Sequence, residues 1–250
     1  MRSARAVVIL LTAGMLLSVG VLSASADDIE GAVLVVDDVD TYAFVGWHGS
    51  YEFPSTLSQP WTIFLDVVSW ATGGGIPADT EILLFTADGT NDPDNTGNLD
   101  AGTFYNRLVA EGYDPDVADQ VDIGTMTDFS AYDLVIYPNL DDRSAANVVN
   151  DGVAFITMEP GQTDEMNIGT GVSVFDDWAQ TFTVVDNTHV TTDTLGAGLL
   201  FFDNAVRTEA IDAAGNGHVL ITVAVPEPGT LMLLAGGFSG LACLRRRRTA

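Results

Sequence analysis

The sequence predicts an α/β fold in which helices flank a mainly parallel sheet and extra β-strands follow in the C-terminal part. Two observations predict this class. Several strand-length apolar runs are continuous rather than alternating, as in strands buried on both faces, and segments with helical spacing separate them. After Gly161 the pattern changes to β-rich segments divided by turn residues, which we expect to extend one edge of the sheet.

The expected elements alternate along the chain as far as residue 158. The clearest helix, 60–72, has proline in its first turn and is followed by three glycines, which are typical start and stop signals. The buried parallel strands are expected at 31–38, 81–86, 132–138 and 152–158, the other helices at 99–111 and 143–150, and the C-terminal strands at 180–185, 197–202 and 218–225.

Residues 1–26 have the features of a secretory signal peptide. Arg2 and Arg5 precede a short apolar stretch that ends in small residues. The pattern Ala24-x-Ala26 places cleavage before Asp27, whereas the apolar stretch is short for a retained membrane anchor. We therefore expect residues 27–225 to be an exported acidic α/β domain.

The exported part is strongly acidic. Between Asp27 and Glu227 there are 35 acidic residues, three arginines and no lysine, a formal net charge of −32. Such a field repels nucleic acid and anionic lipid, which excludes both as partners of the domain, and it attracts divalent cations. Adaptation of the surface to a salty medium is the alternative. The only cysteine, Cys243, excludes a disulfide within the chain.

Residues 226–250 combine three features in order. Two prolines break any helix or strand that leads into an apolar run of 14 residues, 231–244. A helix of that length spans about 21 Å and would be a short transmembrane helix, with the basic end in the cytoplasm and the acidic domain outside. The residues that carry this pattern are Pro226, Glu227, Pro228, Arg245, Arg246, Arg247 and Arg248.

This arrangement resembles the PEP-CTERM sorting signal of Gram-negative bacteria. The resemblance implies that an exosortase, a membrane transpeptidase-like protease, removes or exchanges the tail. It also implies a precursor anchored in the inner membrane and a final place at the cell surface or in the extracellular matrix, in association with exopolysaccharide. It covers only the tail and does not bear on the domain before it.

The domain itself resembles the class I glutamine amidotransferase-like fold, a flavodoxin-like arrangement. The segments that carry this resemblance are VLVVDD, LVAEGYDPDV, FSAYDLVIYPNL and GVAFITMEPG. The later segment VVDNTHVTTDTLGAG resembles the Asn-x-His-Pro-(Ile/Val)-Thr loop of such domains, with Val190 where proline is usual. The amidotransferases use a cysteine after a central strand. This domain contains none, so the resemblance does not imply that chemistry.

Acidic residues follow the expected strands. In an open parallel sheet ligands bind beyond the carboxyl ends of the strands, and clustered carboxylates favour a cation. The alternative is that so acidic a chain places carboxylates in every loop. The predicted ligand edge consists of Asp37, Asp38, Asp88 and Glu159, with Asp141 and Asp142 after a further strand.

A second candidate metal site has calcium-loop spacing. Oxygen donors recur at every second position and Gly97 stands at the sixth, as in the first half of an EF-hand loop. Thr103 stands where the acid of position twelve is expected, so an acid from elsewhere, such as Asp88, would have to complete the site. An ordinary Asp/Asn/Gly turn is the alternative. The predicted ligands are Asp92, Asp94, Thr96, Asn98 and Asp100.

No catalytic motif stands out. The chain has no Gly-x-Ser-x-Gly, and His48, His189 and His218 share no motif. The sequence therefore predicts an exported envelope or matrix protein whose non-catalytic domain binds a cation such as calcium, a glycan or another surface protein. The alternative is an extracellular carbohydrate-active hydrolase with an acidic, metal-dependent site, which would need two carboxyls about 5–9 Å apart in a cleft.

Overall fold

The computed structural model describes residues 30–47, 58–86, 99–138 and 143–224, which belong to one compact unit, Glu30–Ala224. Its elements are β1 (Glu30–Asp37), β2 (Tyr42–Val45), α3 (Ser58–Ala71), η1 (Pro77–Asp79), β3 (Ile82–Thr86), α4 (Leu99–Ala110), β4 (Asp116–Asp119), η2 (Gln120–Asp122), β5 (Leu134–Tyr137), α5 (Ala146–Asp151), β6 (Ala154–Thr157), η3 (Pro160–Gln162), β7 (Gly169–Val184), β8 (Gly198–Ala213) and β9 (His218–Ala224).

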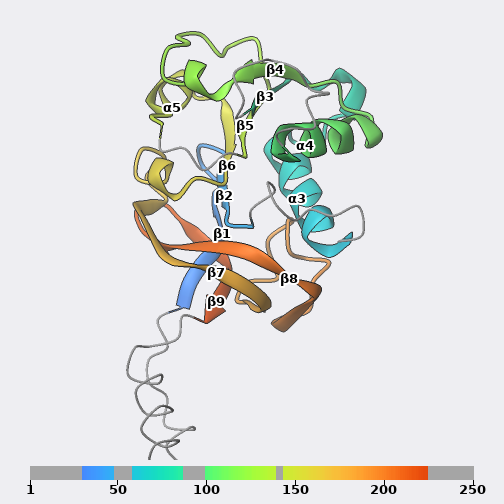
Figure 1. Ribbon diagram of the computed structural model, residues 1–250, viewed down its shortest axis with the longest axis vertical. Coiled ribbons are helices and arrows are strands. Elements are labelled where there is room, and N and C mark those ends of the chain that lie inside the picture. Colours follow the sequence, from blue (N-terminus) through green and yellow to red (C-terminus); the bar gives the residue numbers. More distant parts are fainter. Residues whose placement is uncertain (1–29, 48–57, 87–98, 139–142, 225–250) are drawn as a thin grey trace, which may run out of the picture. The chain divides into compact units, whose positions relative to one another are not determined.

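The described strands form a mixed sheet with two different halves. Its order is β4-β3-β5-β6-β2-β1-β8-β7-β9, with an additional pairing between β1 and β9. Every neighbouring pair from β4 to β2 is parallel. Every pairing of β1, β7, β8 and β9 is antiparallel. Figure 1 shows the two halves one above the other, with β7, β8 and β9 at the lower end.

The antiparallel half closes on itself. Strand β1 pairs with β9, β9 with β7, β7 with β8, and β8 returns to β1 where Ala32 lies opposite Ile211. Strands β7 and β8 are each 16 residues long and bend at register shifts. Irregularities of this kind let a strand curve and change neighbours.

The predicted fold class, a mainly parallel sheet of flavodoxin or amidotransferase type flanked by helices, is wrong. In the part of the chain that the structure describes, β-strands make up 41% of the residues, helices are few, and the antiparallel half closes on itself. The expected strand 31–38 forms as β1, but its partners run antiparallel to it. The later β-rich segments thus build half of the sheet instead of extending one edge of a parallel sheet.

A tight turn explains the misread orientation of β1. The Asp37 carboxylate accepts a hydrogen bond from the backbone N–H of Val39 at 2.8 Å. The backbone carbonyl oxygen of Asp37 accepts one from the backbone N–H of Thr41 at 2.9 Å. Thr41 has φ +62°, in the left-handed region. The chain therefore reverses directly, Tyr42 lies opposite Asp37, and no crossover helix follows β1.

Most elements of the parallel half are confirmed. The helices expected at 60–72 and 99–111 form as α3 and α4, and the strands expected at 81–86, 132–138 and 152–158 form as β3, β5 and β6. Two short strands were not predicted. β2 follows the turn at once, and β4 is a half-exposed edge strand with an acid at each end, which is typical of protected sheet edges.

The parallel strands are covered on both faces. Along β5, Leu134 and Ile136 pack into the cluster that contains α3 and α4 side chains, whereas Val135 and Tyr137 pack into the cluster that contains α5 side chains. Figure 1 shows α3 and α4 on one side of these strands and α5 on the other. The expectation of strands buried on both faces is correct for this half.

An aromatic group fills the interior of the antiparallel half. Trp47, just after β2, is 1% exposed. Its ring meets Phe182 of β7 edge-on at 5.8 Å and Phe202 of β8 at 5.5 Å. The same residue forms a bridge to Thr208 of β8. Trp47 therefore links the end of the parallel half to the closed antiparallel strands.

Candidate functional site

The structure does not bring the predicted ligand edge together. β1 runs antiparallel to β2, and β2 runs parallel to β6, so β1 and β6 have their carboxyl ends at opposite ends of the sheet. Asp37 and Asp38 lie at one of these ends and Glu159 at the other. Asp88, Asp141 and Asp142 lie outside the described residues.

Two of these acids hold turns. Asp37 is 1% exposed, and besides the N–H groups of the β1–β2 turn its carboxylate accepts the side-chain amide of Asn216 at 3.2 Å. The buried Glu159 accepts the N–H of Gly161 at 2.9 Å and caps η3. Both contacts are of the kind that acidic side chains make at turns and helix starts.

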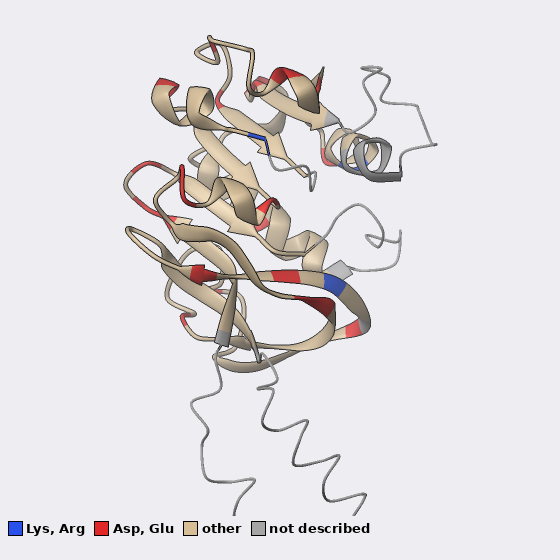
Figure 2. Ribbon diagram, turned by 60° about the vertical axis from the view of Figure 1, so that its left-hand side comes forward, with Lys and Arg blue, Asp and Glu red and all other residues tan. Residues whose placement is uncertain are grey.

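The predicted calcium ligands Asp92, Asp94, Thr96 and Asn98 lie outside the described residues, and Asp100 belongs to the start of α4. Acidic residues elsewhere are spread over strands, helices and loops, as Figure 2 shows. The calcium loop therefore stays a prediction.

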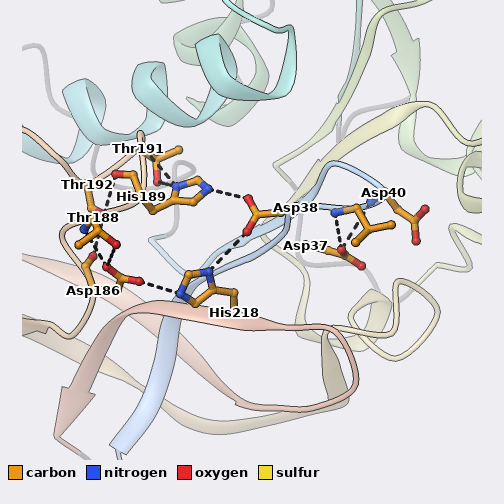
Figure 3. Close-up of polar contacts among 10 residues, drawn as sticks. Asp37, Asp38, Asp40, Asp186, Thr188, His189, Thr191, Thr192 and His218 are labelled. Atoms are coloured by element: carbon orange, nitrogen blue, oxygen red, sulfur yellow. Dashed lines mark hydrogen bonds and ion pairs between the residues drawn. The ribbon is translucent and has the colours of Figure 1, made fainter.

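A group of ionisable side chains gathers at the carboxyl end of β1. We call it the His–Asp cluster: Asp38 in the β1–β2 turn, Asp186 and His189 after β7, and His218 at the start of β9. Figure 3 shows both histidines facing the Asp38 carboxylate, with His189 at one of its oxygens and His218 at the other. The pairing of β1 with β9, which sets Val36 opposite His218, brings these segments together.

His189 is held in a defined orientation. Its Nε2 lies 2.8 Å from Asp38 Oδ1, and its Nδ1 faces the Thr191 hydroxyl at 2.8 Å and the Thr191 backbone N–H at 3.2 Å. A backbone N–H can only donate, so Nδ1 accepts and Nε2 carries the hydrogen given to Asp38. The Trp70 ring of α3 packs edge-on against the imidazole at 5.5 Å.

His218 lies between two carboxylates. Its Nε2 is 2.9 Å from Asp186 Oδ2, and its Nδ1 is 3.5 Å from Asp38 Oδ2. Both nitrogens can donate together only when the ring is protonated. The backbone N–H and hydroxyl of Thr188, each 2.7 Å from Asp186 Oδ1, lower the pKa of Asp186 first, and the contact with His218 lowers it further.

The geometry of the cluster favours a clamp between chain segments. Thr191, His189 and Asp38 resemble a hydroxyl–imidazole–carboxylate relay, but Thr191 is fully buried, so no substrate can reach its hydroxyl. Two imidazoles and two carboxylates are also the donor types that zinc accepts. Yet among the described residues no group of three or more such side chains is arranged to hold a metal ion. What the cluster does is join the β1–β2 turn, the β7–β8 loop and β9.

Sequence reasoning missed this cluster because its members are separated by up to 180 positions. The local signal was Asp186-x-Thr188-His189, in which the acid accepts the N–H two residues on, as in an Asx turn. That pattern predicts a rigid loop. It does not identify Asp38 and His218 as neighbours, which depends on the antiparallel pairing of β1 with β9.

Asp186→Asn is expected to lower the melting temperature near neutral pH, and this deficit should shrink as pH falls from about 4, the ordinary aspartate pKa, towards the lower pKa of the folded carboxyl. A carboxyl whose pKa is lower in the folded state stabilises the fold above its unfolded pKa, and this stability is lost as pH falls through the folded pKa. Melting curves of both proteins between pH 7 and pH 3 measure the difference. Asp203→Asn, an exposed change on β8, is the control, and a constant Asp186→Asn deficit across this range would contradict the expectation.

The comparison with known proteins assigns a family motif to the tail and to no other part of the chain. Residues 224–248 match the family described as the PEP-CTERM protein-sorting motif. No curated protein and no solved structure matches the chain, so the resemblance of the domain to the amidotransferase-like fold has no structural support.

The motif confirms the predicted sorting signal. It implies an exported precursor that passes the membrane and is processed at the envelope by an exosortase. Among the described residues no helix is long and apolar enough to span a membrane. The signal peptide at 1–26 and the apolar run at 231–244 lie outside those residues.

Proposed function

We propose that this chain is an envelope or extracellular-matrix protein whose acidic domain binds divalent cations, calcium above all, outside the cell. The observation that carries the proposal is the composition of the exported part, 35 acidic residues against three arginines. The sorting motif supports the location. The Asp92–Asp100 spacing supplies a candidate for a specific site.

The charge of the domain supports cation binding in two ways. The first effect is non-specific: the carboxylates repel one another and oppose the compact state, and the cations of any salt relieve part of that repulsion by screening. A specific site does more, because an ion bound only to the folded state stabilises it by about 2.7 kcal/mol at a hundredfold excess over Kd. The two effects are separable by comparing ions at equal ionic strength.

The test is thermal melting of the mature protein in calcium chloride and in sodium chloride at matched ionic strength. We expect calcium to raise the melting temperature of the wild type more than sodium does, and we expect Asp92→Asn with Asp94→Asn to remove that difference. Asp203→Asn with Asp212→Asn removes the same charge from exposed positions on β8 and should keep the difference.

Equal melting of the wild type in the two salts would contradict a specific calcium site and would favour general salt adaptation. Loss of the calcium effect in both double variants would show that total charge matters and that the loop does not.

Glycan binding is the second candidate, and one surface favours it. Trp178 is 47% exposed and lies opposite Arg207, which makes a bidentate contact to Asp176. An exposed indole beside planar polar groups suits a sugar ring, which offers C–H groups on its face and hydroxyls at its edge. Retardation of the protein by exopolysaccharide in native gels, lost in Trp178→Ala, would support this role. Release of reducing ends would instead favour the hydrolase.

A further inference from the structure

One end of the β7–β8 hairpin exposes apolar side chains. Thr181 lies opposite Phe201 and Thr183 opposite Leu199, so these residues share one face, while the intervening Phe182 and Val184 are buried. Leu199 is 67%, Phe201 58% and Val185 46% exposed. We call this surface the apolar hairpin face: Thr181, Thr183, Val185, Leu199 and Phe201.

The apolar hairpin face is uncharged in a domain that is acidic elsewhere. Residues 178–185 and 195–202 contain no charged side chain, and the next acids along the chain are Asp186 and Asp203. Contiguous exposed apolar surface on a soluble domain commonly marks a contact with another molecule or a membrane. The occupant must tolerate an uncharged face surrounded by carboxylates.

The face lies at the end of the domain from which the tail departs. Thr183 is opposite both Leu199 of β8 and Thr222 of β9, so the three residues form one row across adjacent strands. Strands are about 4.8 Å apart, which puts Leu199 about 10 Å from Thr222. Thr222 is two residues before Ala224, where β9 ends.

The tail is a short tether. Six residues, 225–230, separate β9 from the apolar run that begins at Leu231. Fully extended, they span at most about 20 Å. While the apolar run is in the membrane, the row that contains Leu199 therefore stays within reach of the lipid surface.

We propose that the apolar hairpin face rests on the membrane while the unprocessed precursor is held there. The field of the domain repels anionic lipid, but this face is free of charge, so a neutral lipid surface can approach it. Leucine, valine and phenylalanine side chains enter the boundary between headgroups and acyl chains readily. A second copy fits less well, because pairing would bring two domains of formal charge −31 together.

The experiment uses the full-length precursor in phosphatidylcholine vesicles made with and without brominated acyl chains, which quench nearby tryptophan. Phe201→Trp places a reporter on the face. Val172→Trp is the matched control, because Val172 is 60% exposed and lies near the other end of β7. We expect brominated lipid to quench the added fluorescence of Phe201→Trp several-fold more than that of Val172→Trp, and Leu199→Asp in the Phe201→Trp background to abolish the excess.

Equal quenching of the two reporters in vesicle-bound protein would overturn the proposal. The proposal would also be overturned if the full-length chain formed a dimer in detergent and Leu199→Asp dissociated that dimer. A second copy of the chain would then be the molecule that covers the face. Melting of each variant checks that it is folded. The proposal rests on the proposed function in one respect, the attachment of the precursor to the membrane by its tail. Flotation of the protein with vesicles tests that attachment by itself, and the melting curves in calcium test cation binding by itself. A failure of the membrane contact can therefore be told apart from a failure of the proposed function.

Discussion

Trp47→Ala is expected to destabilise the domain by about 3–5 kcal/mol, the usual range for removing a large buried aromatic side chain. The indole is 1% exposed and packs against Phe182 and Phe202, so its loss opens a cavity between the end of the parallel half and the closed antiparallel strands. In a domain of this size such a loss lowers the melting temperature by about 10 °C. Differential scanning calorimetry measures it.

Trp178→Ala is the matched control for that variant. It makes the same chemical change at a residue that is 47% exposed on β7, where we expect a cost within about 1 kcal/mol. Similar melting of the two variants would contradict the described packing of Trp47, and with it the way in which the closed antiparallel half joins the parallel half.

The parallel half could be predicted from local sequence, because its signals are local. The strands β3, β5 and β6 are continuous apolar runs, and α3 lies between a proline in its first turn and three glycines. Each of these patterns has one common structural meaning. What they leave open is the direction and order of the strands, which depends on the connections.

The fold class could not be predicted because β1 carries the same signal as a parallel strand. Its apolar run and the two acids after it are typical of a strand that leads to a crossover helix. The deciding feature is the turn held by the Asp37 carboxylate and by Thr41 at positive φ. Threonine is not a residue that marks this conformation, so the reversal has no clear sequence signature.

The strands predicted at 180–185 and 197–202 cover only part of β7 and β8, because the rest of these strands also lacks a clear local signal. Only 180–185 and 197–202 are strongly apolar, whereas the other parts of these strands carry acids such as Asp176 and Glu209 that face outward in register. A strand with one face in solvent and irregular register lacks a clean alternation. The His–Asp cluster depends on the same pairings, so it was hidden with them.

Deleting residues 226–250 is expected to move most of the protein from the membrane fraction into the medium or periplasm while leaving its melting unchanged. β9 ends at Ala224, and the buried hydrophobic residues described here all lie before that point. Fractionation of cells and melting of the released protein measure the two effects. Cys243→Ser, which keeps all three features of the tail, should stay with the envelope, whereas aggregation of the truncated protein inside the cell would make the tail part of the fold.

The most direct measurement is the intact mass of the protein recovered from the envelope of cells that contain an exosortase. An exported chain sorted through its tail should begin at Asp27 and lack Arg245–Arg248, because the signal peptide and the PEP-CTERM tail have both been processed. A protein that keeps Met1 and all four terminal arginines would contradict export and sorting by this route.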